Sequence, residues 1–297
     1  MIDNCFFGVM KCRWVLVLLV GFMLNCEFSI LNSQFYIFNS ASAQTDLVLD
    51  PEVGGRLSVG LDKKIVKGLH VSLEEEARFD KNFRSFDRLQ TTLGLSYKVN
   101  KYFKCGIGYV FMNPYSNSSS SFGDFRHRLF VDATGTVRMG KWSLSLKERF
   151  QWTYRSGDFN EYQYPRNALT LKSRLTLKYK GFAKVTPYAY FEIRNFMNAP
   201  VIHALYDGTS YLTEEGSEVG EAGWFLQSFK GGYINRYRGS VGVDWKISKH
   251  HQLNFYFLGD YVSDKVVDAN ADGTKLKSYT KEKGFRGTLG AGYVYAF

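Results

Sequence analysis

Proline and cysteine are scarce in this chain, and long apolar runs are almost absent. The 297 residues include 5 prolines and 4 cysteines, with a formal net charge of +10 and a mean hydropathy of −0.24. A polytopic helical membrane protein needs several apolar runs of about 20 residues, so that class is excluded. No apolar stripe with the 3.6-residue helical period stands out after residue 43, which argues against a helical soluble domain.

Aromatic residues and glycines, by contrast, are abundant. The chain has 25 Phe, 20 Tyr and 28 Gly, and 45% of its residues are hydrophobic. Such a composition is too aromatic and too apolar for a disordered chain. Two classes remain, an all-β secreted protein and a β-barrel.

The first 43 residues are expected to be an export signal. Lys11 and Arg13 precede an apolar run over residues 14–24, and Ala41-Ser42-Ala43 matches the small-x-small cleavage pattern. The run is too short for a membrane-spanning helix and suits the core of a signal peptide. Because signal peptides usually have about 15–30 residues, we expect the true start codon to be Met10. Residues 44–297 then form one domain.

Cleavage would remove three of the four cysteines. Cys5, Cys12 and Cys26 lie in the leader, and Cys105 remains alone. A lipoprotein anchor at Cys26 is an alternative, but Asn25 stands where a small residue is expected. With one cysteine the exported domain has no internal disulfide. Closure of a sheet into a barrel would supply the stability instead.

Eleven segments of the exported domain alternate apolar and polar residues with a period of two. In residues 141–155, for example, Trp142, Leu144 and Trp152 share one parity, and Lys147 and Arg149 share the other. Such alternation predicts β-strands with one apolar face. Because bacterial barrels have an even number of strands, we expect twelve, or failing that ten. The segments are 53–62, 68–80, 84–99, 101–114, 123–139, 141–155, 165–181, 184–196, 231–248, 250–266 and 283–297.

The connections between these segments alternate between tight and long. Tight turns are expected at 99–101, 139–141, 180–182 and 248–250. Long loops are expected at 114–123, 156–165, 197–232 and 263–283. Short periplasmic turns and long extracellular loops are typical of outer-membrane barrels.

The last segment ends on an aromatic residue. Tyr293, Tyr295 and Phe297 lie on one face of the strand expected over 285–297. This pattern resembles the terminal signal that the outer-membrane barrel assembly machinery reads, which makes that machinery an expected partner. A soluble sandwich could also end in an aromatic strand. Strand length, loop asymmetry and the leader together favour the barrel.

In a barrel, the polar parity would face the lumen. It carries more cations than acids, which allows two interpretations: a cation-rich lumen that favours anions, or arginine–carboxylate pairs that brace a filled interior. Lys172, Arg194, Asp132 and Asp260 belong to the same face. The charged lumen residues that we single out are Arg78, Arg88, Arg126, Arg128, Lys147, Arg149, Arg174, Arg236 and Arg238, together with Glu74, Glu76 and Glu192.

Two further motifs are weaker. The residues Asp268, Asn270 and Asp272, followed by Gly273, match the opening of a calcium loop, but position twelve is Tyr279 where a bidentate glutamate is needed. The motif also fits an ordinary turn. A Ser-rich tip at 115–122 and the 197–230 segment could bind an extracellular ligand. The cations alternate along strands, so we expect contact with lipids and lipopolysaccharide, not with nucleic acid.

No enzyme is expected. A lipid hydrolase would need a serine activated by a nearby histidine. His70 and Ser72 share a face but lie near a predicted periplasmic turn, and His127 faces lipid by parity. An outer-membrane lipid hydrolase or deacylase therefore stands as an alternative without a convincing constellation.

Several charged segments together resemble a known family. They are Leu73–Phe79, Phe125–Phe130, Ser145–Gln151, Leu171–Tyr179 and Pro187–Glu192. In this order they resemble the Gram-negative outer-membrane barrels catalogued as domain of unknown function 2490, over most of residues 53–262. The resemblance implies a barrel in the outer membrane and brings no catalytic residues. We therefore expect a structural protein or a narrow channel with a cation-rich lumen.

Overall fold

The structure is a computed structural model. It describes residues 45–157, 160–204, 211–212, 218–219, 224–269, 271 and 276–297. The predicted leader, residues 1–43, lies outside these ranges. Among the residues that the structure describes, no helix combines the length and the apolar character that a bilayer crossing requires.

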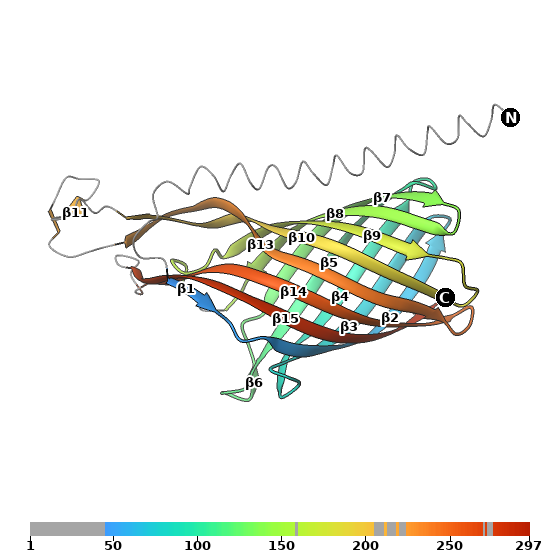
Figure 1. The fold of residues 1–297 in the computed structure, drawn as a ribbon, viewed down its shortest axis with the longest axis horizontal. Coiled ribbons are helices and arrows are strands. Elements are labelled where there is room, and N and C mark those ends of the chain that lie inside the picture. Colours follow the sequence, from blue (N-terminus) through green and yellow to red (C-terminus); the bar gives the residue numbers. More distant parts are fainter. Residues whose placement is uncertain are drawn as a thin grey trace, which may run out of the picture.

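Within the described residues, eleven strands close into one barrel (Figure 1). Each corresponds to one of the eleven alternating segments. Neighbours along the chain pair antiparallel, and the first and last strands pair in parallel to close the sheet. The strands are β2 (Glu52–Val66), β3 (Leu69–Asp80), β4 (Ser85–Lys98), β5 (Phe103–Ser116), β7 (Arg126–Met139), β8 (Trp142–Arg155), β9 (Asn167–Tyr179), β10 (Val185–Ala204), β13 (Trp224–Lys246), β14 (His251–Ala269) and β15 (Leu276–Ala296).

The predicted count of twelve strands is not confirmed, nor is the fallback of ten. The short strand β1 (Thr45–Val48) does not add a strand to the barrel, because it also pairs in parallel with β15, just before β2 does. The N–H of Leu49 donates to Lys283 O at 2.7 Å between the two pairings. β1 and β2 thus follow β15 as one interrupted strand, and an odd number of strands requires the parallel seam.

One end of the barrel, the short-turn end, carries all four predicted tight turns and the C-terminus (Figure 1). Gly68 and Gly140 provide positive φ angles of 88° and 60° in two of its turns. The opposite end is called the long-loop end. Its shorter pieces are β6 (Ser121–Phe122), β11 (Tyr211–Leu212) and β12 (Glu218–Val219).

At the long-loop end, strands continue where loops were predicted. β10 runs on to Ala204 and β13 begins at Trp224. The pairing of β14 with β15 starts at Ala269 and Leu276 and continues toward the short-turn end. Pairs such as Asp264 with Glu282 join polar residues on both strands. This extension lacks the lipid-facing alternation, which is why the sequence pattern ended early.

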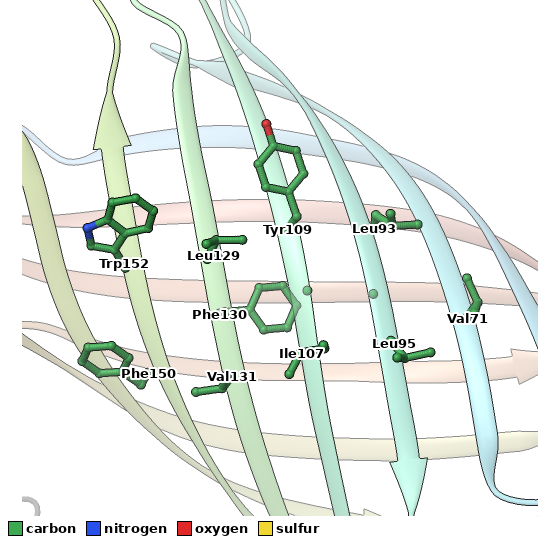
Figure 2. A pocket seen from close by; sticks show the side chains of 12 residues that line it. Val71, Leu93, Leu95, Ile107, Tyr109, Leu129, Phe130, Val131, Phe150 and Trp152 are labelled. Carbon is green, nitrogen blue, oxygen red and sulfur yellow. The ribbon is translucent and has the colours of Figure 1, made fainter.

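The outer face is apolar and the inner face is charged. Leu93 and Val241 are 51% and 58% exposed, whereas Glu192 and Asp260 are 2% and 4% exposed. A soluble sandwich would bury the first pair and expose the second. Figure 2 shows side chains of β3, β4, β5, β7 and β8 that border an apolar groove of about 620 Å³; except for Phe130, those labelled have the outward parity. The faces therefore exclude the sandwich alternative.

Carboxylates interrupt the apolar face at Glu75 on β3 and at Glu148 on β8. Glu148 has the outward parity of Trp142 and Phe150 on β8. The hydroxyl of Ser173, its paired residue on β9, donates to Glu148 Oε2 at 2.5 Å. A short polar contact thus lies at mid-height of the lipid-facing wall.

Candidate functional site

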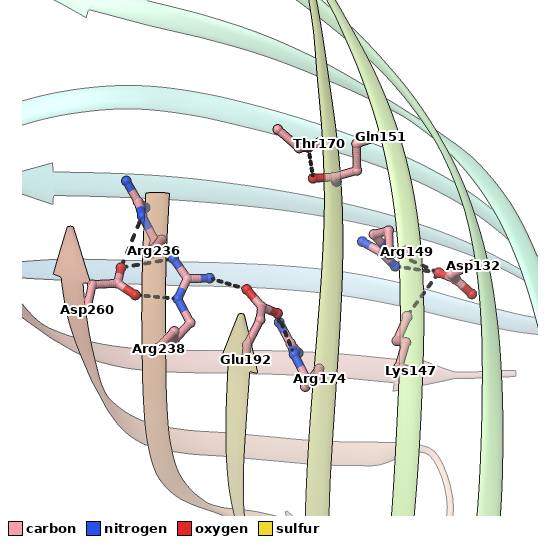
Figure 3. A network of polar contacts seen from close by, with 10 residues as sticks. All are labelled: Asp132, Lys147, Arg149, Gln151, Thr170, Arg174, Glu192, Arg236, Arg238 and Asp260. Carbon is pink, nitrogen blue, oxygen red and sulfur yellow. Dashed lines mark hydrogen bonds and ion pairs between the residues drawn. The ribbon is translucent and has the colours of Figure 1, made fainter. Parts of the chain in front are cut away.

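A row of alternating charges, here called the brace row, lies on the inner face of four adjacent strands. Its members are Asp260 on β14, Arg238 on β13, Glu192 on β10 and Arg174 on β9, each paired in register with the next. Arg238 donates from Nε and Nη2 to the two oxygens of Asp260 at 2.6 and 2.9 Å, and its Nη1 lies 3.3 Å from Glu192 Oε1. Arg174 Nη2 lies 2.6 Å from Glu192 Oε2 (Figure 3).

The alternation explains how these charges tolerate burial. A buried ion is costly unless it is paired and hydrogen-bonded, and Arg238 lies between two carboxylates. The guanidinium of Arg174 also lies 4.3 Å from the ring centroid of Tyr190. The brace row therefore holds together β9, β10, β13 and β14 from within.

A second ionic cluster continues the bracing on β7 and β8. Asp132 Oδ2 lies 3.0 Å from Lys147 Nζ and 2.6 Å from Arg149 Nη2. The guanidinium of Arg149 also lies 3.9 Å from the ring centroid of Phe130. The interpretation that arginine–carboxylate pairs brace the interior thus applies to the brace row and to this second cluster.

A different row lies one inward-facing position closer to the long-loop end. It consists of Arg236, Arg194 and Lys172 on β13, β10 and β9, in direct register, and is here called the cation row. Arg236 Nη1 is 3.6 Å from Asp260, and none of the ion pairs in the described part of the chain includes Arg194 or Lys172. The Nε atoms of Arg194 and Arg236 are buried without a hydrogen-bond acceptor.

The cation row faces a chamber of about 360 Å³ inside the long-loop half of the barrel. Neutral polar groups contribute to its wall, among them Gln151, Thr153 and Thr170. Its charged lining is strongly biased toward one sign. Among the described residues its carboxylates are Asp264 and Glu282, against the cations Arg78, Arg88, Arg126, Arg128, Arg155, Lys172, Arg194, Arg236, Arg238 and Lys265.

A β-bulge shapes the wall of this chamber. Arg194 pairs with Arg236 while the next residue, Asn195, pairs with Ile234, so Asn235 is an extra residue on β13. Its side chain lines the chamber, and its Nδ2 donates to Asp264 Oδ1 at 2.7 Å. The bulge thus adds a neutral polar side chain beside the cation row.

The connection between β8 and β9 covers part of the chamber. Gln163, Tyr164 and Pro165 line it, and Gln163 Nε2 donates to Asp268 Oδ1 on β14 at 2.6 Å. This contact reaches past β10 and β13. The guanidinium of Arg155 lies 4.9 Å from the ring centroid of Tyr164.

The candidate calcium residues are only partly described. Asp268 bonds to Gln163, while Asn270 and Asp272 lie outside the described residues. In the part of the chain that the structure describes, no group of three or more His, Cys, Asp or Glu residues could hold a metal ion.

The singled-out lumen residues divide between these features. Arg78, Arg88, Arg126, Arg128, Arg236 and Arg238 line the chamber. Lys147, Arg149, Arg174 and Glu192 belong to the ionic clusters, whereas Glu76 pairs with Arg78 at 2.6 Å and Glu74 lines neither the chamber nor the clusters.

Sequence reasoning placed Lys172 and Arg194 inside but did not single them out. It missed Gln163, which lay in a predicted loop, and Lys265, which lay where the predicted strand 250–266 overlaps the predicted loop 263–283. These residues come together because of the register between neighbouring strands. The sequence of a single segment does not indicate that register.

Among the described histidines, the imidazole contacts that the structure shows are with groups other than a serine hydroxyl. His70 Nδ1 bonds to Asp62 at 2.9 Å, His127 to the Tyr109 hydroxyl, His250 to the Ala296 carbonyl and His251 to the Tyr293 hydroxyl. Each imidazole therefore has a structural contact. His203 lies among residues whose side chains are not described.

A closed sheet with an apolar exterior and a charged interior defines the class of transmembrane β-barrels. Residues 57–202 match the family model described as "Protein of unknown function (DUF2490)". The family resemblance drawn from the charged segments is confirmed over these residues.

Similar solved structures include three outer-membrane proteins. The outer-membrane expressed OmpT of Vibrio cholerae is 12% identical over 76% of this chain, with a TM-score of 0.31. Only 63% of that chain is covered, so this chain spans less than two thirds of it. NanC porin is 10% identical over 76% of this chain and 93% of its own, with a TM-score of 0.39. The anion-selective porin from Comamonas acidovorans is 10% identical over 77% of this chain and 55% of its own, with a TM-score of 0.31. No curated protein matches the chain.

Proposed function

We propose that the protein is an outer-membrane barrel of a Gram-negative bacterium that admits small anions to its chamber and passes them through a narrow channel. One observation carries the proposal: Lys172 and Arg194 of the cation row face the chamber, and no ion pair of the described residues includes either of them. The apolar outer face and the short turns support a barrel that spans the membrane with its long-loop end outside.

The charge distribution supports anion selectivity. Low-dielectric walls focus the field of clustered charges, so the local concentration of counter-ions rises inside such a chamber. The brace row lies next to the cation row on the side of the short-turn end, and its charges are already paired. These side chains would narrow the passage that an anion takes from the chamber through the barrel. An anion would thus meet Lys172 and Arg194 before it reached the paired charges of the brace row, while cations would be repelled at entry.

Planar-bilayer recording under a salt gradient tests this proposal. Heat-modifiable migration on a gel first identifies folded barrel. We expect discrete anion-selective steps, and a Lys172→Gln/Arg194→Gln variant should shift the reversal potential toward zero. Lys141→Gln, in the β7–β8 turn, is the matched control and should leave the potential unchanged. A folded barrel that passes no current, or that selects cations, would overturn the proposal.

Recognition by the assembly machinery is a related proposal. Tyr293, Tyr295 and Phe297 lie at the short-turn end, where the rings of Tyr295 and Phe297 are 4.7 Å apart. Contact with lipopolysaccharide, calcium at residues 268–273 and the absence of enzyme activity stay predictions. No feature of the described histidines favours the lipid-hydrolase alternative.

A further inference from the structure

We propose that the chamber is a binding site for a soluble oxyanion that carries at least two negative charges, of which inorganic phosphate is the simplest. The inference rests on the proposed function in using the same chamber, but it concerns equilibrium binding and not passage. The chamber lies inside the barrel wall, so its ligand is a soluble anion and not a lipid headgroup.

The charge balance calls for more than one negative charge. Four of the lining cations already have a carboxylate: Arg78 contacts Glu76 at 2.6 Å, Arg88 contacts Asp87 at 2.6 Å, and Arg236 and Arg238 share Asp260. Arg155 and Lys265 lie over the rings of Tyr164 and Tyr233, respectively.

The four remaining cations are Arg126, Arg128, Lys172 and Arg194. No ion pair of the described residues includes any of them. Arg128 Nε donates at 2.9 Å to the neutral hydroxyl of Thr153. The carboxylates Asp264 and Glu282 of the chamber offset two of these four charges. A single chloride would leave part of the remaining excess uncompensated, whereas a multivalent anion satisfies several of these groups together.

The donor geometry selects oxygens on one compact group. Three of the four cations are arginines, whose planar guanidinium forks match the oxygen pairs of phosphate and carboxylate. Arg194 and Arg236 lie on adjacent strands, and each has a buried Nε without an acceptor. Adjacent strands are about 4.8 Å apart, so the row offers donors from three strands within about 10 Å.

The volume sets the size of the ligand. About 360 Å³ lies at the lower end of the range for small-molecule pockets, which is about 300–1,000 Å³. Gln151 and Thr170 lie in the same wall, where the Thr170 hydroxyl is 3.5 Å from Gln151 Oε1 (Figure 3). The chamber therefore suits a phosphate-sized anion or a small organic phosphate and excludes polymers.

Titration of the purified barrel tests this inference. The full chain is expressed, and folded barrel is purified from membranes in a neutral detergent. Calorimetry at pH 7.5 compares sodium phosphate with sodium chloride at matched ionic strength. We expect saturable phosphate binding and a phosphate-dependent rise in Tm, because a ligand that binds only the folded state stabilises it. Chloride should produce neither effect.

Charge-removing variants make the test specific. Lys172→Gln/Arg194→Gln should weaken phosphate binding about tenfold or more, since charge-assisted hydrogen bonds are the strong ones. Lys141→Gln should bind as the wild type does. Equal responses to phosphate and chloride, or wild-type affinity in a heat-modifiable double variant, would overturn the inference. Anion-selective current without phosphate binding would refute this inference alone, whereas phosphate binding without current would refute only the channel.

Discussion

Replacing Arg238 with methionine asks how much the brace row stabilises the barrel. Arg238 forms two hydrogen bonds with Asp260, at 2.6 and 2.9 Å, and lies 3.3 Å from Glu192. Without it Glu192 keeps Arg174, whereas Asp260 keeps only Arg236 at 3.6 Å. Breaking a buried ion pair typically costs about 3–5 kcal/mol. Because one of the two carboxylates stays well paired, we expect a loss of about 3 kcal/mol in unfolding free energy.

The second half of the test removes both members of the pair. Arg238→Met combined with Asp260→Leu leaves no unpaired carboxylate, and apolar replacement of a whole buried pair is often neutral. The double variant should therefore recover most of the loss. Urea unfolding of the barrel in lipid vesicles, followed by tryptophan fluorescence, measures both changes, with Lys141→Met as the control. A single variant within about 1 kcal/mol of the wild type, or a double variant no better than the single one, would refute the reasoning.

Three other predictions concern the outer wall, the chamber and the last residue. Glu148→Leu should raise the unfolding free energy in vesicles by about 1–2 kcal/mol, because an ionisable group on the lipid face is destabilising; a decrease would mean that its contact with Ser173 outweighs that penalty. Gln163→Glu should release the β8–β9 connection, since it places a like charge 2.6 Å from Asp268. Trypsin should then cut at Arg166 several times faster, and an unchanged rate would show that the contact does not hold the connection. Deleting Phe297 should lower the amount of heat-modifiable barrel in cell membranes while refolding in detergent changes little; equal losses in both assays would assign the residue to stability instead.

The wall of the barrel was predictable because lipid imposes a simple rule on it. Alternation around Leu93, Trp142 and Val241 identified each strand and its outward face, and each of the eleven segments became one strand of the barrel. The rule of even strand number then led to an expected count of twelve. The parallel pairing of β2 with β15 has no counterpart in the pattern of either segment.

Of the site, only the excess of positive charge was predictable from the sequence. The excess of inward cations was visible in the sequence, but the contact between Glu192 and Arg238 joins residues 46 positions apart. In the brace row a cation faces a carboxylate on the neighbouring strand, and in the cation row it faces another cation. A shift of two residues in the register between the strands would change these partners. The bulge at Asn235 and the contact of Gln163 with Asp268 add to this, and neither follows from local composition.

The parallel seam places the two ends of the barrel chain at opposite ends of the barrel. In an even-stranded barrel the first strand starts where the last one finishes, whereas here Thr45 of β1 lies at the long-loop end and Phe297 at the short-turn end (Figure 1). In the membrane orientation proposed above, an epitope placed before β1 would be readable by antibody on intact cells. The same epitope after Ala296 would be readable only once the outer membrane is opened. In that proposed orientation, the odd number of strands places the two ends of one domain in different compartments.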